Sequence, residues 1–268
     1  MITHHTVEAN GIQIHVATAG KGPPLLLLHG FPHTWLVWRE VMETLAATHQ
    51  VIAPDLRGMG ATTRAASGYD LDTLVADALA VLPGQPAIVA GLDLGAPVAF
   101  LAAARHPDRV RSLVVMEALL GTLPGAETFA APWWFAFHAQ PGLPEALLDG
   151  HEDAWVDHFL RIGTRHAIAT DIRTALHEAY RGPASVRCAL AHYRALPTNA
   201  RLVADAPGLR VPALALAGGV VGDALLRQLA PRCALLVTAR IDDAAHILPL
   251  DQPAAVSQAI ARFARAHP

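Results

Sequence analysis

The segment VAGLDLGAPVA, residues 89–99, combines an apolar strand, a tight glycine turn and the beginning of a helix. Gly91 and Gly95 flank Asp93 at two-residue spacing, a pattern that forces the central residue into strained backbone angles. Hydrolases often hold a serine at the middle of such a turn. The aspartate is open to two interpretations: a nucleophile at the N-terminus of a helix, where the dipole favours an anion, or a cap for the helix that begins near Leu94.

Short, continuous apolar runs surround this turn and alternate with helix-like segments. Such runs are typical of strands that are buried on both faces of a parallel sheet. They span residues 24–30, 50–55, 86–93, 110–118, 211–219 and 233–240. Their alternation with helices predicts an α/β sheet with right-handed crossovers. Asn10-Gly11 between two alternating segments predicts a hairpin at the N-terminus.

One interval in this alternation is far longer than the others. Residues 119–209 show no strand pattern, several helix-like pieces and three of the five tryptophans. A connection of that length predicts an inserted helical cap. The cap is expected over the C-terminal edge of the sheet, where ligands bind in open α/β folds. Residues 1–118 and 210–268 would then form the core domain.

The composition excludes several classes of protein. The chain has 268 residues, 53% hydrophobic and 16% charged, with a formal net charge of −3, which favours a well-buried globular enzyme without a nucleic-acid partner. The cysteines Cys188 and Cys233 have no metal-type spacing and fit a reducing compartment. The N-terminus lacks a signal-peptide pattern and no apolar run is long enough to span a bilayer, so we expect a soluble, cytoplasmic protein without a membrane partner.

The apolar run at residues 24–28 leads into His29-Gly30-Phe31-Pro32. Gly30 allows a sharp turn and Pro32 restricts the chain after Phe31. This arrangement can direct the amide N–H of Phe31 into the crevice beside the amide N–H of Leu94. Two such donors would form an oxyanion hole.

A histidine and a carboxylate complete the candidate set. His246 follows the last strand-like run, and a histidine at such an edge can act as a base near neutral pH. Glu117 ends an apolar strand, where a charge is costly unless it is paired. Asp223 follows the next strand and is the alternative acid, although it also suits a helix cap.

These pieces together resemble the α/β-hydrolase fold, in particular the branch of epoxide hydrolases and haloalkane dehalogenases. The segments HGFPHTW, VIAPDLRGMGAT, GLDLGA, VVMEA and HILPLDQP occur in the family's order. The resemblance implies a mostly parallel eight-stranded sheet flanked by helices, with an inserted helical cap. It implies Asp93 as nucleophile, His246 as base and Glu117 as the acid of a bacterial subgroup. Tyr193, in AHYRAL, would face the nucleophile from the cap, and no metal or cofactor is implied.

The chain departs from the family's pattern at several positions. Epoxide hydrolases usually carry a second proton donor in the cap, and that position falls at about Trp134, with His138 as a nearby substitute. Leu94 replaces the tryptophan that follows the nucleophile in many dehalogenases. Fluoroacetate-type enzymes have arginines after the nucleophile, and DLGAPVAF has none. His33 is expected to line the pocket, whereas Trp155 is expected in the core of a cap helix.

The sequence therefore predicts a hydrolase that opens a small, apolar epoxide to a vicinal diol. Asp93 would form an alkyl ester, and water activated by His246 would hydrolyse it. The alternative is a haloalkane (or haloacid) dehalogenase with the same ester chemistry, in which Trp133 and Trp134 would bind the halide. A third interpretation is a non-catalytic homologue. A homodimer is common for such folds, and the sequence itself carries no sign of one.

Overall fold

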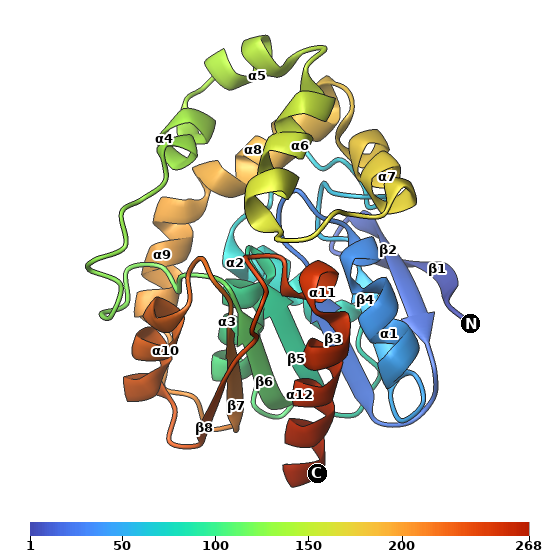
Figure 1. The fold of residues 1–268 in the computed structure, drawn as a ribbon, viewed down its shortest axis with the longest axis vertical. Coiled ribbons are helices and arrows are strands. Elements are labelled where there is room, and N and C mark those ends of the chain that lie inside the picture. The colour runs from blue at the N-terminus through green and yellow to red at the C-terminus, as the bar shows by residue number, and fades with distance from the viewer. Residues whose placement is uncertain (268) are drawn as a thin grey trace.

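The computed structural model describes residues 1–267 and has an eight-stranded sheet at its centre (Figure 1). The strands are β1 (Thr3–Ala9), β2 (Ile12–Ala19), β3 (Pro24–Leu28), β4 (Gln50–Pro54), β5 (Ala87–Leu92), β6 (Val110–Met116), β7 (Ala213–Ala217) and β8 (Leu236–Arg240). Their order is β1-β2-β4-β3-β5-β6-β7-β8, and β2 is antiparallel to both β1 and β4 while the other pairs are parallel. The predicted mostly parallel eight-stranded sheet is confirmed.

The hairpin at the N-terminus has the geometry that its sequence predicts. Ala9 lies opposite Ile12, so the loop between β1 and β2 has two residues. Both loop residues, Asn10 and Gly11, have positive φ angles, of 48° and 74°. This combination matches the twist of the two strands and explains why Asn-Gly is favoured here.

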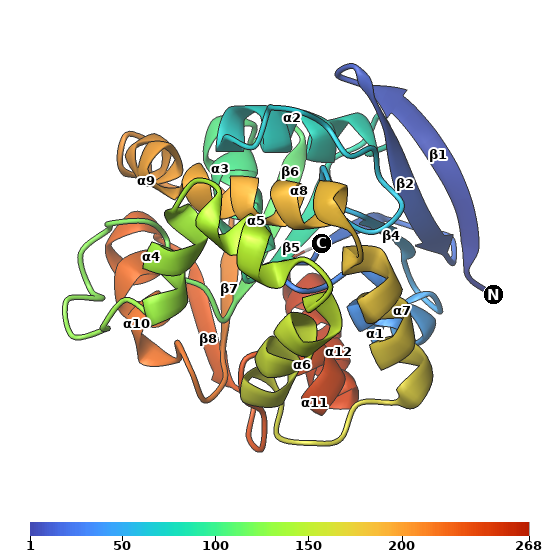
Figure 2. The same cartoon turned by 90° about the horizontal axis from the view of Figure 1, so that it is seen from above.

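Helices cover both faces of the sheet (Figure 2). The core helices are α1 (Arg39–Leu45), α2 (Leu71–Ala80), α3 (Gly95–Arg105), α10 (Asp223–Leu229), α11 (Leu248–Asp251) and α12 (Pro253–Ala266), with the 3₁₀ segments η1 (Trp35–Trp38) and η2 (Ala230–Arg232). Helices α1 and α12 pack together on one face, and α2 and α3 pack together on the other. Strands β3, β5 and β7 are buried along their whole length, as their unbroken apolar runs predict.

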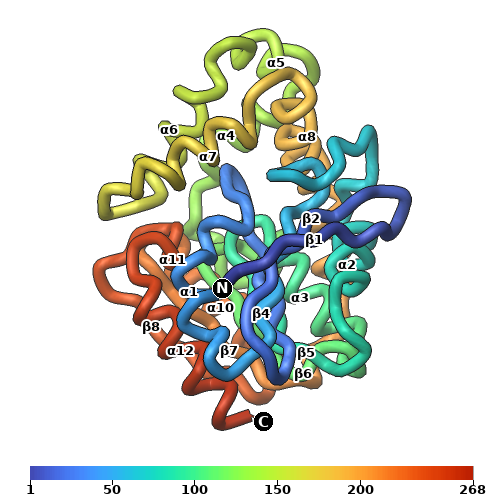
Figure 3. The backbone as a smooth tube through the Cα atoms, turned by 90° about the vertical axis from the view of Figure 1, so that its right-hand side faces the viewer, coloured from blue at the N-terminus to red at the C-terminus, as the bar shows by residue number. Residues whose placement is uncertain are grey.

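Six helices connect β6 to β7, and this part of the described chain has no strand. They are α4 (Trp133–Ala139), α5 (Leu143–Leu148), α6 (Glu152–Gly163), α7 (Thr170–Tyr180), α8 (Pro183–Arg194) and α9 (Leu196–Ala204). Figures 1 and 3 show α4 to α8 above one end of the sheet, on the side away from the C-terminus. Helix α9 instead packs against α2 and α3. The division into a cap of residues 119–209 and a core stays a prediction.

Within residues 1–267, every helix is too short or too polar to cross a membrane.

Candidate active site

The turn at Asp93 joins the end of β5 directly to the beginning of α3. Asp93 has a φ of +52°, a left-handed conformation that is costly for a residue with a side chain. A Cβ atom on Gly91 would lie 2.3 Å from the carbonyl oxygen of Gly95, so the close approach of strand and helix requires glycine. Helix α3 has no side-chain cap at its N-terminus. The Asp93 carboxylate is therefore directed elsewhere, contrary to the helix-cap interpretation.

The loop after β3 brings a backbone donor to this carboxylate. The N–H of Phe31 donates to Oδ1 of Asp93 at 2.8 Å. A Cβ atom on Gly30 would lie only 2.2 Å from the same Oδ1, so the loop needs glycine at that position. His29 holds the loop, because its Nε2 accepts the N–H of Leu56 at 3.0 Å.

The second expected oxyanion donor is not engaged in the free protein. Leu94 follows Asp93 at the N-cap of α3, and within residues 1–267 its amide makes no hydrogen bond to the Asp93 carboxylate. The N–H of Phe31 is thus the one expected oxyanion donor that already contacts the nucleophile. The part played by the Leu94 amide stays a prediction.

The structure brings His246 between the two carboxylates that the motifs point to. Its Nε2 lies 3.2 Å from Oδ2 of Asp93, and its Nδ1 lies 3.6 Å from Oε2 of Glu117. The backbone N–H of His246 donates to the carbonyl of Gly163, at the end of α6, at 2.9 Å. Helix α6 thus helps to hold the histidine loop.

Glu117 lies directly after β6 and is completely buried. Its φ is +46°, so this residue, like Asp93, occupies a strained left-handed conformation at a strand end. Four backbone N–H groups of the loop after β7 donate to its carboxylate at 2.6–3.3 Å: those of Gly218, Val220, Val221 and Gly222. This accounts for a charge at the end of an apolar strand.

Asp223, the alternative acid, lies outside this arrangement. It is the first residue of α10, its side chain is 60% exposed, and it forms an ion pair with Arg240. Its carboxylate does not contact His246 within residues 1–267. The structure thus favours Glu117 over Asp223 as the partner of the histidine.

The electrostatics of the three groups favour an ionised resting state. Burial by itself raises the pKa of Asp93, but the hydrogen bond and charge of His246, with smaller effects of His33 and the Phe31 N–H, lower that pKa below its usual value. The pKa of Glu117 is lowered in the same way by His246 and backbone donors, against the effect of burial. Burial lowers the pKa of His246, yet the two carboxylates outweigh it and raise the pKa to about 9.

Phe31 also anchors the region above the sheet. Five rings surround its ring with centroids 4.8–5.9 Å away: His138 of α4, Trp155 and Phe159 of α6, Tyr180 of α7 and Tyr193 of α8. We call these six residues the Phe31 cluster. The residue that donates to the nucleophile is therefore packed by four different helices.

Tyr193 lies in this cluster, and the catalytic role that the family resemblance implies for it stays a prediction. It is buried, and burial together with the negative charge of Asp93 keeps its pKa well above the usual value. Within residues 1–267 its hydroxyl makes no hydrogen bond. The group is thus a protonated donor at pH 7 that is free to contact a ligand.

The two tryptophans expected at the pocket lie differently. Trp133 is 63% exposed, so the prediction that it lines the pocket is wrong: as the first residue of α4 it faces solvent. Trp134 is half-buried, and its ring contacts are to Trp133, Phe135 and Phe159. His138, one turn further along α4, lies against Tyr193, with 4.4 Å between the two ring centroids.

His33 is completely buried in the loop after Phe31. Both of its ring nitrogens lack a hydrogen-bond partner within residues 1–267. Burial lowers its pKa to about 3 although the nearby charge of Asp93 opposes this, so the imidazole is neutral. It lies near the charge of Asp93, and its role as a pocket residue stays a prediction.

Two residues of this region have contacts that the sequence does not predict. Tyr180 is buried, and its hydroxyl donates to the carbonyl of His33 at 2.7 Å, which ties α7 to the loop after β3. Trp155, expected only as core, donates its indole N–H to Nε2 of His138 at 3.1 Å. The one sequence feature that points to these residues is helical spacing, which places Trp155 and Phe159 on one face of α6. Spacing does not show which part of the protein that face packs against.

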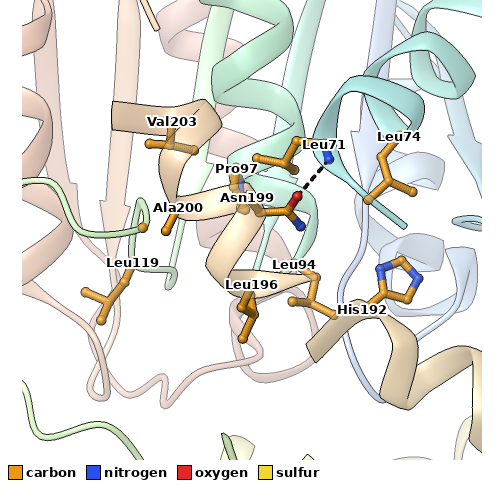
Figure 4. Close-up of a pocket in the computed structure, with 11 residues that line it drawn as sticks. Leu71, Leu74, Leu94, Pro97, Leu119, His192, Leu196, Asn199, Ala200 and Val203 are labelled. Atoms are coloured by element: carbon orange, nitrogen blue, oxygen red, sulfur yellow. Dashed lines mark hydrogen bonds between the residues drawn. The ribbon is translucent and has the colours of Figure 1, made fainter. Parts of the chain in front are cut away.

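A cavity of about 50 Å³ lies beside Leu94, the residue after the nucleophile (Figure 4). Its walls come from α2, α3, α8, α9 and the chain after β6, and consist of Leu71, Leu74, Leu94, Pro97, Leu119, Gly121, His192, Leu196, Asn199, Ala200 and Val203. The polar groups in this lining are already used: Oδ1 of Asn199 accepts the N–H of Leu71 at 2.8 Å, and His192 bonds the carbonyl of Arg57 at 2.9 Å. The cavity is therefore apolar in character.

Among the residues that the structure describes, His, Cys, Asp and Glu side chains form no group of three or more that could hold a metal ion.

Comparison with known proteins identifies the family to which the chain belongs. Residues 23–253 match the family described as alpha/beta hydrolase fold. The soluble epoxide hydrolase of Corynebacterium sp. (strain C12) is 39% identical over 134 residues, which are 49% of this chain and 47% of that enzyme. The chain thus matches about half the length of that relative.

Two solved structures resemble the chain over almost its whole length. Cfl2 from Burkholderia cenocepacia has a TM-score of 0.90 at 30% identity and covers 98% of this chain and 95% of its own. The epoxide hydrolase CorEH has a TM-score of 0.89 at 26% identity and covers 99% of both chains. This chain therefore belongs to the α/β-hydrolase family and is similar to epoxide hydrolases within it.

Proposed function

We propose that the protein hydrolyses epoxides to vicinal diols through a covalent alkyl ester on Asp93. The arrangement of the Asp93 carboxylate carries this proposal, with Oδ1 on the N–H of Phe31 and Oδ2 beside His246. An ester formed through Oδ2 leaves Oδ1 as the carbonyl oxygen. That oxygen already has a preset N–H donor for the negative charge that develops when water attacks.

The first step would be attack by Asp93 on an epoxide carbon. The carboxylate is ionised at pH 7, so no base has to activate it. As the new C–O bond forms, the ring C–O bond breaks and its electron pair goes to the epoxide oxygen. Tyr193 would donate a proton to this oxygen, since its raised pKa keeps the hydroxyl protonated until the oxygen becomes strongly basic.

The second step would be hydrolysis of the ester. Esterification removes the negative charge of Asp93, one of the two charges that raise the pKa of His246. The imidazolium then passes its proton through water to the Tyr193 phenolate left by the first step, and Glu117 holds the neutral imidazole in place. His246 can take a proton from water while the water oxygen attacks the ester carbonyl carbon. It gives this proton to the diol oxygen as the acyl C–O bond breaks, and the carboxylic acid of Asp93 then returns its own proton to His246.

The substrate class that we propose is a small, mostly apolar epoxide, with water as the second reactant. The aromatic Phe31 cluster and the cavity beside Leu94 both favour apolar substituents. The printed names of similar proteins, soluble epoxide hydrolase and epoxide hydrolase CorEH, support the choice of an epoxide.

The dehalogenase alternative receives less support. A leaving halide needs N–H donors, but Trp133 faces solvent and the indole N–H of Trp155 is bonded to His138. Trp134 is the one indole of α4 that remains available to this interpretation. The non-catalytic interpretation does not account for a strained Asp93 directed at a backbone donor and a histidine.

A substrate panel separates these alternatives. Styrene oxide and 1-bromobutane are incubated with the wild type and with Asp93→Ala, and diol and bromide are both measured. We expect diol without bromide from the wild type and neither product from the variant. Bromide release without diol would assign the dehalogenase reaction, whereas unchanged diol formation by Asp93→Ala would contradict the ester mechanism.

A further inference from the structure

Asp251 is a buried carboxylate that the proposed reaction steps do not use. It is the last residue of α11 and lies in the segment HILPLDQP, which also contains His246. The residue is only 7% exposed. A buried charge is costly unless hydrogen bonds compensate for the loss of water, so the partners of this carboxylate should show what it does.

Three backbone N–H groups from two separate segments donate to the Asp251 carboxylate. Its Oδ1 accepts the N–H of Arg165 at 2.9 Å and that of His166 at 3.1 Å. Its Oδ2 accepts the N–H of Ala245, the residue before the proposed base His246, at 2.8 Å. Figures 1 and 2 show the end of α6 beside α11. One side chain therefore joins the segment after α6 to the histidine loop.

The same two segments are also bonded directly to each other. The carbonyl oxygen of Gly163, the last residue of α6, accepts the N–H of His246 at 2.9 Å and that of Ile247 at 2.8 Å. Helix α6 carries two rings of the Phe31 cluster as well. The position of the histidine backbone is thus linked to the position of α6.

Ala245 is held from the side of the sheet too. Its carbonyl oxygen accepts the N–H of Gly219 at 2.9 Å, and Gly219 belongs to the loop whose N–H groups surround the Glu117 carboxylate. A Cβ atom on Gly218 would lie 2.2 Å from the same carbonyl oxygen, so the two loops are closely packed. Ala245 is therefore fixed at its N–H by α11 and at its carbonyl by the loop around Glu117.

We propose that Asp251 is a positioning residue for His246, whose loop it fixes against the segment after α6 so that the imidazole stays between the two carboxylates of the site. Asp251 acts through backbone N–H groups and does not touch the substrate. The step that depends on it is hydrolysis of the Asp93 ester, and this part of the inference rests on the proposed function.

Asp251→Asn should remove one of these contacts selectively. The amide of asparagine has one acceptor oxygen and one NH₂ group. With its oxygen toward Arg165 and His166 it keeps two hydrogen bonds, and its NH₂ faces the N–H of Ala245. The opposite orientation would place the NH₂ against two donors, so the first is favoured. The variant should therefore keep the segment after α6 in place and release the histidine loop.

The position of His246 can be measured without any substrate. Its pKa of about 9 depends on the two carboxylates beside the ring. A pH titration of ¹⁵N-histidine-labelled protein by long-range ¹H–¹⁵N spectra reports this pKa, with the His246 signals assigned by difference from His246→Gln. In Asp251→Asn we expect the pKa to fall from about 9 toward 6.5, because the ring moves away from its partners.

The matched control is Asp243→Asn. Asp243 lies in the same loop, but its carboxylate is 62% exposed and pairs with the side chain of His166 at 2.9 Å. This variant removes a charge from the loop and leaves the N–H of Ala245 bonded, so the pKa of His246 should stay at the wild-type value. If Asp251→Asn does not fold, Asp251→Glu, which shifts the two oxygens by one methylene group, gives the same test with a smaller expected decrease.

Single-turnover kinetics with styrene oxide show which step depends on Asp251. Formation of the Asp93 ester needs the nucleophile and the proton donor, whereas its hydrolysis needs His246 as the base. We expect Asp251→Asn to form the ester at close to the wild-type rate and to hydrolyse it about ten- to hundred-fold more slowly, the usual effect of a displaced catalytic group. The ester should then accumulate as a mass increase on the Asp93 peptide. Thermal unfolding checks that each variant is folded.

A purely structural role for Asp251 is the competing explanation and predicts different results. A folded Asp251→Asn (or, in its place, Asp251→Glu) with the wild-type pKa of His246, or with both steps slowed equally, would assign Asp251 to stability alone. An equal decrease of that pKa in Asp243→Asn would also overturn the inference. A wild type that forms no diol from any epoxide, while the pKa of His246 falls in Asp251→Asn alone, would contradict the proposed function and support the positioning of His246 by Asp251.

Discussion

The two sides of the site are built in different ways. On the side of the sheet, Asp93 and Glu117 directly follow strands β5 and β6, and backbone N–H groups hold both carboxylates. On the side of α4 to α8, aromatic rings from four helices meet at Phe31 and hold one another by packing. The first side is fixed by backbone geometry, the second by side-chain shape.

This difference indicates how the work is divided. Groups fixed at strand ends can keep the nucleophile and the base in one geometry through both chemical steps. Replacement of one of the aromatic rings by an apolar side chain of similar size should lower activity less, because each ring shares its contacts with several neighbours. Substitutions near the sheet should therefore remove a step of the reaction, while those on the exposed side of α4 should change little.

The largest effect is expected at Asp93. Asp93→Ala removes the nucleophile, so diol formation should fall by about 10⁴-fold or more. The control is Asp223→Ala, which removes an exposed aspartate that pairs with Arg240 and should retain wild-type turnover. If both variants kept their activity, the sheet side of the site would have no catalytic role.

A substitution of His246 should separate the two steps. His246→Gln leaves Asp93 able to attack but removes the base, so the alkyl ester should accumulate. Mass spectrometry of the protein after one turnover should show an increase on the Asp93 peptide equal to the mass of the epoxide. An unmodified peptide in a folded His246→Gln protein would count against a covalent intermediate.

Glu117→Gln should affect both activity and folding. The NH₂ group of the new side chain would face N–H donors of the loop that includes Gly218 and Gly222, so donor would meet donor. The substitution also removes a negative charge that stabilises the imidazolium of His246. We expect turnover to fall about 10²- to 10³-fold and the melting temperature to decrease. Asp223→Asn is the matched control, and a loss in that variant instead would return the role of acid to Asp223.

Stability should depend on pH through His246. Its pKa is raised from 6.5 in the unfolded chain to about 9 in the folded protein. The stabilisation is therefore fully present below pH 6.5 and is lost as the pH rises through about 9, an effect on the order of 3 kcal/mol. Urea unfolding from pH 6 to 9.5 should show this loss in the wild type and a flatter profile in His246→Gln. Parallel profiles would contradict it.

The smallest effect is expected for Trp133→Ala. Because that ring is exposed on α4, diol formation should stay within about two-fold of the wild type and the melting temperature should change little. Trp155→Ala, a buried ring of the Phe31 cluster, is the contrasting variant and should destabilise the protein by about 3–5 kcal/mol. A large loss of activity in Trp133→Ala would mean that α4 has a different orientation when substrate is bound.

The sequence allowed more to be predicted about the sheet side than about the helices above it. Asp93, Phe31 and Glu117 stand next to strands whose apolar runs are plain, so their meeting at one sheet edge follows from topology. The orientation of α4 does not follow from its sequence WWFAFHA, in which almost every face is apolar. Packing against α8 turned His138 inward and Trp133 outward. Helical periodicity identifies a buried face only when the other face is polar.

The contacts of Glu117 have a consequence for how this site could change. The loop at residues 218–222 folds around that carboxylate as a cradle of backbone amides folds around a bound anion. The residue that orients the histidine is thus also the template for its neighbouring loop. Moving the acid to a position after β7 would take more than one substitution, because the loop would lose the anion around which it is shaped.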